Sequence, residues 1–251
     1  NDVLGDSIPA VFYDKKGNKM NSIPEGVQKQ WNNEYGVKVG YNPKTEMLYY
    51  DGEVETNLVV SKSAKEVFVN ALTDTKTGKS TYKEYGKINF GYDLGYPNGA
   101  PGKLTLGGAS KSINLFVKGV PLKSREAYID LADFDFNNSG KSLYHKYQNV
   151  GIREYNFARV FEHEWMGHVL TGKFGEGMFL NSSRKTGPAV QVVNKYRVEM
   201  GLLLRLNYGL PNDGTMIFGN SEEDLKASLK SLRKGNTEGL KMLVPTWYMS
   251  K

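Results

Sequence analysis

The stretch "FEHEWMGHVL" at residues 161–170 holds two of the three histidines of the chain, His163 and His168, with Glu164 directly after the first. An ideal helix turns by about 100° per residue, so histidines five positions apart point about 140° away from each other. One extra residue in the turn, a π-bulge, would restore their convergence, and Gly167 makes such an irregular turn sterically easier. The spacing therefore predicts a wide turn at residues 165–167, with both imidazoles pointing to one side.

Convergent imidazoles would form part of a metal site, but the pattern also has a simpler interpretation. Two histidines on a helix are more often surface or core residues with ordinary hydrogen bonds. The scarcity of histidine in the chain and the adjacent Glu164 favour a site. The chain has no cysteine, which excludes disulfides and thiolate chemistry and leaves His, Asp, Glu, Asn and Gln as metal ligands.

The composition is that of a folded protein without marked charge segregation. With 251 residues, 39% of them hydrophobic and 12% aromatic, the chain can bury a core. The 33 Lys and Arg residues exceed the 27 Asp and Glu residues, but no run of like charge indicates a nucleic-acid arm or a polybasic membrane anchor. No apolar stretch approaches transmembrane length, and no signal peptide is visible. The chain starts with Asn1 rather than Met, so we expect a processed or trimmed chain whose targeting segment would lie upstream.

The local patterns predict a single α+β domain over residues 1–251, with a strand-rich part over about residues 1–140 and a helical part over about residues 150–235. In the first part we expect a proline-started helix at 24–36, a hairpin at 37–52, a helix capped by Ser63 at 63–74 and a strand at 127–136. The glycine-rich residues 91–112 are expected to form loops and hairpin turns. In the second part we expect helices at 153–171, 189–205 and 221–235.

Two resemblances bear on the histidine helix. The letters "HEWMGH" match H-E-x-x-G-H, the signature of the dipeptidyl peptidase III family of zinc peptidases, in which the helix is bulged. The longer stretch "ARVFEHEWMGHVLTGKFGEG", followed by "GPAVQVVNKYRVEMGLLLRLNYG", resembles the metallopeptidase domains at the C-termini of bacterial polymorphic toxins of the Rhs type. In that family a second helix carries N-x-x-R and a glycine-leucine end, followed by R-x-x-Y. The matching residues here are Asn194, Arg197, Gly201, Leu202, Arg205 and Tyr208, and the resemblance spans roughly residues 128–209.

These resemblances imply a zinc site and a hydrolytic role. His163 and His168 would bind the zinc as neutral imidazoles, and Glu164 would be the general base that takes a proton from water. Arg205 and Tyr208 would stabilise the oxyanion of the tetrahedral intermediate, although an arginine at a helix end can equally cap backbone carbonyls. Glu162 would orient a histidine or, as the simpler alternative, face water.

The third zinc ligand is the open question of this interpretation. Glu199 is the best match, because the row Val192, Tyr196, Glu199 and Leu203 is otherwise apolar or aromatic and an inward carboxylate needs a partner. The alternative partner of Glu199 is an arginine, Arg159 or Arg205. The toxin domains often carry an acidic residue earlier in this helix, where this chain has Gly187 and Pro188. Three other candidate ligands are therefore kept: Glu176, Asn194 and His145.

Residues 127–136 are, by analogy with many zinc peptidases, the candidate edge strand for pairing with a substrate backbone. This segment contains Asp130, Asp133 and Asp135, which could bind calcium. The spacing lacks the glycine and the distal glutamate of an EF-hand loop, and therefore favours a strand-to-loop turn.

The hypothesis that follows is a zinc-dependent peptidase with a protein or peptide substrate. As the resemblance to toxin domains implies, it would be a bacterial effector or toxin, secreted or delivered outside the producing cell, with an immunity or inhibitor protein as a further partner. One alternative is a non-catalytic binding module on the same fold, against which Glu164 speaks. Another is a basic toxin that acts on nucleic acid, but no dense basic patch is present and no nucleic-acid partner is expected.

Overall fold

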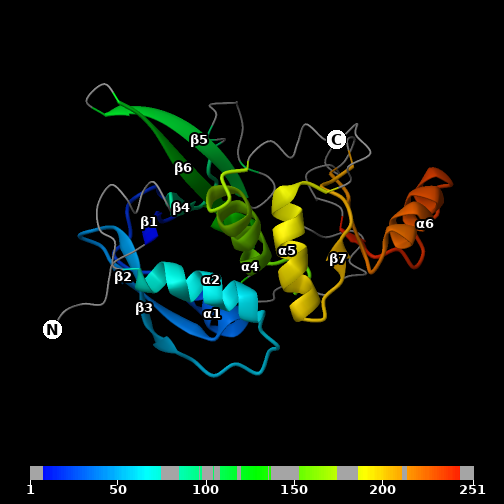
Figure 1. Ribbon diagram of the computed structural model, residues 1–251, viewed down its shortest axis with the longest axis horizontal. Helices are drawn as coiled ribbons and strands as arrows, with labels where there is room; N and C mark the ends of the chain where they lie inside the picture. Colours follow the sequence, from blue (N-terminus) through cyan, green and yellow to red (C-terminus); the bar gives the residue numbers. More distant parts are fainter. Residues whose placement is uncertain are drawn as a thin grey trace.

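A six-stranded sheet is the central layer of the protein, and its strand order is β2-β3-β1-β4-β6-β5. The computed structural model describes residues 8–74, 85–95, 97, 104, 108–117, 120–134, 136, 153–173, 186–210 and 214–243. The strands are β1 (Ile8–Phe12), β2 (Val37–Asn42), β3 (Met47–Glu53), β4 (Lys87–Gly91), β5 (Gly108–Val117) and β6 (Val120–Asp130). Strand β4 pairs in parallel with β1 and β6, and the other pairs are antiparallel. The ribbon of β5 and β6 extends beyond the helices (Figure 1).

Three helical segments pack on this sheet. Helices α1 (Glu25–Tyr35) and α2 (Lys62–Thr73) pack near β2 and β3, whereas α4 (Phe157–Phe161) continues into the π-helix η2 (Glu162–Val169), which packs against β5 and β6. Buried aromatic rings of these helices and of strand β4 form one core, made of Trp31, Phe68, Phe90, Phe157, Phe161 and Trp165. Burial of such large apolar side chains is the main stabilising contribution to this layer.

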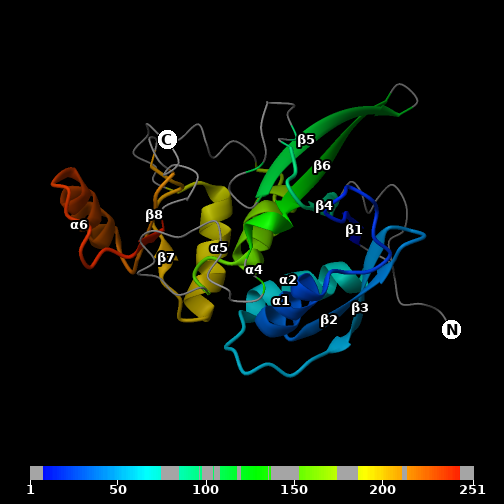
Figure 2. The same cartoon turned by 180° about the vertical axis from the view of Figure 1, so that it is seen from behind.

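The described residues from 186 onwards form a smaller sheet with one helix on each side. Helix α5 (Pro188–Glu199) lies between η2 and the three-stranded sheet of β7 (Leu204–Arg205), β8 (Met216–Gly219) and β9 (Met242–Leu243). Helix α6 (Glu222–Arg233) packs on β8 at the end of the molecule farthest from the β2–β3 hairpin (Figures 1 and 2). Among the described residues, none of the helices has the length and hydrophobicity needed to cross a membrane.

The mixed α/β class and several expected elements are confirmed. Helix α1 follows Pro24 and ends at Gly36, whose φ of 62° is left-handed. Strands β2 and β3 form the expected hairpin. Helix α6 begins with a capping box between Ser221 and Asp224. Asp130 forms the expected turn, because its carboxylate accepts hydrogen bonds from the backbone of Asp93, Leu94 and Ala132.

Four expected boundaries are corrected. The cap of α2 is Ser61 rather than Ser63, since the Ser61 hydroxyl accepts the Ala64 N–H at 3.0 Å. The strand expected at 127–136 is β6, which begins at Val120 and ends at Asp130. The helix expected at 153–171 begins only at Phe157, after the cap Asn156. The helix expected at 189–205 ends at Glu199, because Gly201 adopts a left-handed φ of 67°.

The expected division into a strand-rich first part and a helical second part is not confirmed. Helices α1 and α2 lie in the first part as expected, but the whole three-stranded sheet belongs to the second. Of the glycine-rich residues 91–112, those described include the start of β5. Asp135 lies outside the described residues.

Candidate active site

The histidine helix has the predicted irregular turn. Residues Glu162–Val169 form a π-helix, and the Leu170 N–H donates to the Trp165 carbonyl at 2.9 Å, a bond across five residues. The ring centres of His163 and His168 are consequently 4.9 Å apart, with the ring planes at 87°. The prediction that the imidazoles converge is therefore confirmed.

Gly167 is required at this turn because α5 approaches it closely. A Cβ atom on Gly167 would lie 2.5 Å from the Cβ of Ala189 and 2.8 Å from its Cα. Both distances are shorter than side-chain contacts in proteins normally allow. The glycine between the two histidines thus serves helix packing as well as the irregular turn.

Both imidazoles are buried and suited to donate a lone pair. His168 Nδ1 lies 2.6 Å from the backbone carbonyl of Lys173. Because a carbonyl oxygen only accepts, Nδ1 is the donor, so in the neutral ring the lone pair lies on Nε2. Burial, together with the positive charge of Arg205, holds the pKa of His163 well below its usual range, so this ring is neutral.

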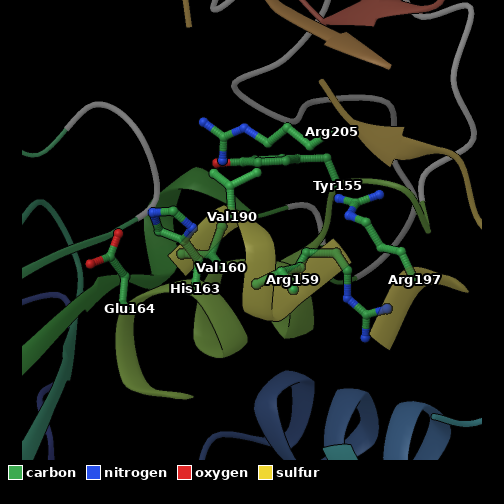
Figure 3. Close-up of a pocket in the computed structure, with 9 residues that line it drawn as sticks. Tyr155, Arg159, Val160, His163, Glu164, Val190, Arg197 and Arg205 are labelled. Atoms are coloured by element: carbon green, nitrogen blue, oxygen red, sulfur yellow. The ribbon is translucent and has the colours of Figure 1, made fainter. Parts of the chain in front are cut away.

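Glu164 lies beside His163 and against the edge of the large sheet (Figure 3). A Cβ atom on Gly108, the first residue of β5, would lie 2.7 Å from the Glu164 Cγ. Strand β5 is one of the two edge strands in the strand order, whereas β6 is paired on both sides, with β4 and β5. The expectation that residues 127–136 provide a free edge is therefore wrong, and the edge next to Glu164 belongs to β5.

The structure also brings Arg205 and Tyr208 to the histidines. The guanidinium carbon of Arg205 lies 5.1 Å from the centre of the Tyr208 ring, and that ring lies 5.7 Å from the centre of the His163 ring. We expected Arg205 to end a helix, but it lies on β7 instead. Its Nε donates to the Asn207 carbonyl at 3.0 Å, and its guanidinium also donates to the Tyr208 carbonyl.

Two other residues of the toxin-like pattern, Asn194 and Arg197, hold the backbone next to Arg205 in place. Asn194 on α5 pairs with the backbone of Arg205 through both side-chain atoms, at 2.8 and 2.9 Å. Arg197 donates to the Leu203 carbonyl at 3.0 Å and to the Glu154 carbonyl. Since both polar atoms of the Asn194 side chain are used, Asn194 is not placed as a metal ligand.

Glu199 does not join the histidines. Its carboxylate accepts hydrogen bonds from the Ser61 hydroxyl at 2.7 Å, the Ser63 N–H at 2.9 Å and the Ser63 hydroxyl at 2.5 Å. These bonds at the N-terminus of α2 lower the pKa of Glu199 to about 2. Its expected arginine partners have other contacts. Glu199 fails as a ligand because α5 ends there, with this carboxylate exposed and facing α2.

No third ligand is found among the residues that the structure describes. In those ranges no group of three His, Cys, Asp or Glu side chains could hold a metal ion. Two of the candidates, His145 and Glu176, lie outside the described residues.

A buried ion network under the helix was not predicted from the sequence. Arg159 bonds Glu162 at 2.7 Å and Glu34 of α1 at 3.3 Å, and the Tyr35 hydroxyl donates to Glu162 at 3.1 Å. The simpler alternative, in which Glu162 faces water, is therefore wrong. Burial outweighs the attraction of Arg159 and raises the pKa of Glu162 to about 7. Glu34 is 125 residues from Arg159 in sequence, so no local pattern could reveal the pair.

A cavity of about 20 Å³ lies between the histidine helix, α5 and β7 (Figure 3). Its walls are formed by Tyr155, Arg159, Val160, His163, Glu164, Val190, Val193, Arg197 and Arg205. A proton-accepting carboxylate, a neutral imidazole and guanidinium groups thus surround one small space, which can support acid–base chemistry. Comparisons of the chain with protein-family models, with curated protein sequences and with solved structures found no match.

Proposed function

We propose that this protein is a zinc-dependent peptide-bond hydrolase. The observation that carries the proposal is the π-turn that brings His163 and His168 to ring centres 4.9 Å apart, with Glu164 on the same stretch of helix. Long π-helical segments are rare and cluster at functional sites. Two ordinary buried histidines would not need this distortion.

The two imidazoles fit a zinc ion, but they are only part of a full ligand set. His168 keeps its Nε2 lone pair because Nδ1 bonds the Lys173 carbonyl, an arrangement typical of metal-ligating histidines. The low pKa of His163 keeps its ring neutral and able to bind. A catalytic zinc has three protein ligands, and His145 and Glu176, which lie outside the described ranges, stay candidates for the third.

Zinc in this position would lower the pKa of a bound water towards neutrality and polarise a carbonyl group. Glu164, buried between the histidine helix and β5, would accept the proton of the attacking water and return it to the leaving nitrogen. The Tyr208 hydroxyl and the guanidinium of Arg205 would stabilise negative charge on the substrate oxygen.

The substrate that suits this site is an extended peptide. Strand β5 is an edge strand that starts against Glu164, so a peptide added as a further strand would pass the proposed base. The resemblance to toxin domains supports a role as an effector or toxin delivered outside the producing cell, with an immunity or inhibitor protein as a partner.

The proposal is tested on Glu164→Gln, which keeps the shape of the side chain and loses the basic oxygen. We expect this variant to keep the zinc content of the wild type and to lose roughly two to four orders of magnitude in turnover of a peptide library. The measurement is elemental analysis of the purified protein, together with a digest of the library with and without chelator.

Each other outcome rejects a part of the proposal. Loss of zinc from Glu164→Gln would make Glu164 a ligand and not the base. Full activity of the variant would place the chemistry elsewhere. Zinc binding without any peptide cleavage by the wild type would favour the non-catalytic binding module.

A further inference from the structure

The long ribbon of β5 and β6 projects from the six-stranded sheet. Strand β4 pairs with β6 only over residues 126–130, whereas β5 and β6 pair with each other over their whole lengths. Among the described residues, the part of β6 from 120 to 125 therefore has no strand neighbour other than β5. At about 3.3 Å per residue this part is about 20 Å long. Figures 1 and 2 show the ribbon extending beyond the helices.

The base of this ribbon is fixed to the histidine helix. Arg125 Nη1 donates to the Val169 carbonyl at 2.8 Å, and Ser124 is buried. Farther out lie residues 113–117 of β5 and 120–123 of β6, which we call the projecting arm. Two strands alone are only marginally stable in water, so we expect a partner to cover the projecting arm.

The sequence of the projecting arm is apolar on both faces of the ribbon. The register pairs Leu115 with Leu122 and Phe116 with Pro121. Because neighbouring residues of a strand lie on opposite faces, the first pair lies on one face and the second on the other. The apolar residues of the projecting arm are Ile113, Leu115, Phe116, Val117, Val120, Pro121 and Leu122. An antiparallel ribbon that covers a core in water needs only one apolar face, so two such faces indicate apolar surroundings on both sides.

The charge of the ribbon is of one sign. The sequence from 108 to 125 contains basic residues and no Asp or Glu. Two of its cations are engaged at the base, where Lys111 lies 3.9 Å from Glu126 and Arg125 bonds to backbone carbonyls. Lys123 belongs to the projecting arm itself. A second copy of this chain would bring the same positive charge, which opposes pairing, whereas an anionic lipid surface complements it.

We propose that the projecting arm docks on an anionic membrane surface. Its apolar residues would enter the boundary between headgroups and acyl chains, and Lys123 would contact the headgroup phosphates. The arm is about 13 Å long, against about 30 Å for the hydrocarbon core, so it docks without crossing the membrane. It lies at the opposite end of β5 from Gly108, which packs against Glu164. Docking requires neither zinc nor a peptide and is therefore independent of the proposed function.

The first test is co-sedimentation of the whole chain with lipid vesicles. One set is made of phosphatidylcholine alone, and the other of phosphatidylcholine and phosphatidylglycerol at three to one. A lysine close to an anionic surface strengthens binding roughly fivefold, so we expect the mixed vesicles to bind at least fivefold more tightly. Added salt is expected to reduce this preference. Absence of binding, or equal binding to both sets, would overturn the proposal.

A pair of matched variants tests the charge of the projecting arm. Lys123→Gln is expected to bind the mixed vesicles roughly fivefold more weakly than the wild type. Lys230→Gln removes the same charge from an exposed position of α6 and is expected to bind as the wild type does. Equal weakening in both variants would attribute binding to the net charge of the protein and would overturn the proposal.

A fluorescent label shows which part of the protein enters the lipid. The chain has no cysteine, so Phe116→Cys can be labelled at a single site with a polarity-sensitive dye. We expect its emission to shift to the blue on addition of mixed vesicles, and the emission of labelled Lys230→Cys to stay unchanged. Vesicle binding without a shift at position 116 would place the contact elsewhere and overturn the proposal. A blue shift that grows with protein concentration in the absence of lipid would assign the projecting arm to a second copy, and would equally overturn it.

Discussion

The contact between Gly167 and Ala189 gives the most direct test of how the histidine turn is held. Substitution of Gly167 by alanine adds one methyl group at a place where the nearest atoms of Ala189 would be 2.5 and 2.8 Å away. Since the second of these atoms belongs to the backbone of α5, rotation of a side chain cannot relieve the clash. The helices must move apart.

The expected effect is that of overpacking a core contact. Insertion of a methyl group into a packed interior raises the free energy of the folded state by about 1–3 kcal/mol. Alanine also stabilises a helix relative to glycine by about 0.5–1 kcal/mol, so the net loss is at most about 2.5 kcal/mol, with a central value of about 1 kcal/mol. In a chain of this size the central value corresponds to a fall in Tm of roughly 2–4 °C.

Ala189→Gly supplies the matched control. It removes the Cβ that the new methyl group would meet at 2.5 Å, while the Cα at 2.8 Å remains, and it lies in the first turn of α5. Thermal unfolding of both single variants and of the double variant gives the coupling between the two sites. We expect the double variant to be more stable than the sum of the single effects. Additive effects, or a Gly167→Ala variant as stable as the wild type, would show that the contact does not hold the turn.

Three further predictions follow from the site and its surroundings. His168→Ala is expected to lose its zinc and, with it, the stabilisation that binding provides, and retention of stoichiometric metal on elemental analysis would show that His168 is not a ligand. Glu199→Gln is expected to keep its zinc. Its free energy of unfolding is expected to be lower by about 0.3–1 kcal/mol, since the carboxylate caps α2. Because the pKa of Glu199 falls from 4.5 to about 2 on folding, its contribution is present above pH 4.5 and is lost as the pH falls towards 2, so the pH dependence of stability in that window should be weaker in the variant. Arg159→Met leaves Glu34 and Glu162 buried together and is expected to lose about 3–5 kcal/mol in denaturant unfolding at pH 8, and a smaller loss than 1 kcal/mol would contradict the ion network.

The features that the sequence predicted well depend on neighbouring residues. The irregular turn at the histidines follows from the five-residue spacing of His163 and His168 and from Gly167. All three residues lie within the six-residue stretch HEWMGH. The ends of α1 and α6 follow from proline, glycine and a capping serine. In each case the interactions that fix the structure span at most a few positions, so local physical rules are sufficient.

The features that the sequence did not predict depend on distant partners. The row that included Glu199 assumed a helix that continues to residue 205, but the left-handed Gly201 ends it, and the nearby N-terminus of α2 binds the carboxylate. The edge position of β5 depends on the order of six strands. Two serines two positions apart compete for the cap of α2, and only the packed helix selects Ser61.

The residues shared with the toxin-like pattern form one continuous set of contacts from α5 to the histidines. The absence of a side chain at Gly167 lets α5 approach the π-helix at Ala189. One turn later on α5, Asn194 holds the backbone of Arg205 in place. Arg197 donates a hydrogen bond to the Leu203 carbonyl, in the segment just before Arg205. The turn that follows places Tyr208 next to His163. Most residues of the pattern thus stabilise the fold. The residue spacing along α5 therefore could not identify the third metal ligand. In the zinc site that we propose, the third ligand is set by tertiary packing, which a local spacing does not encode.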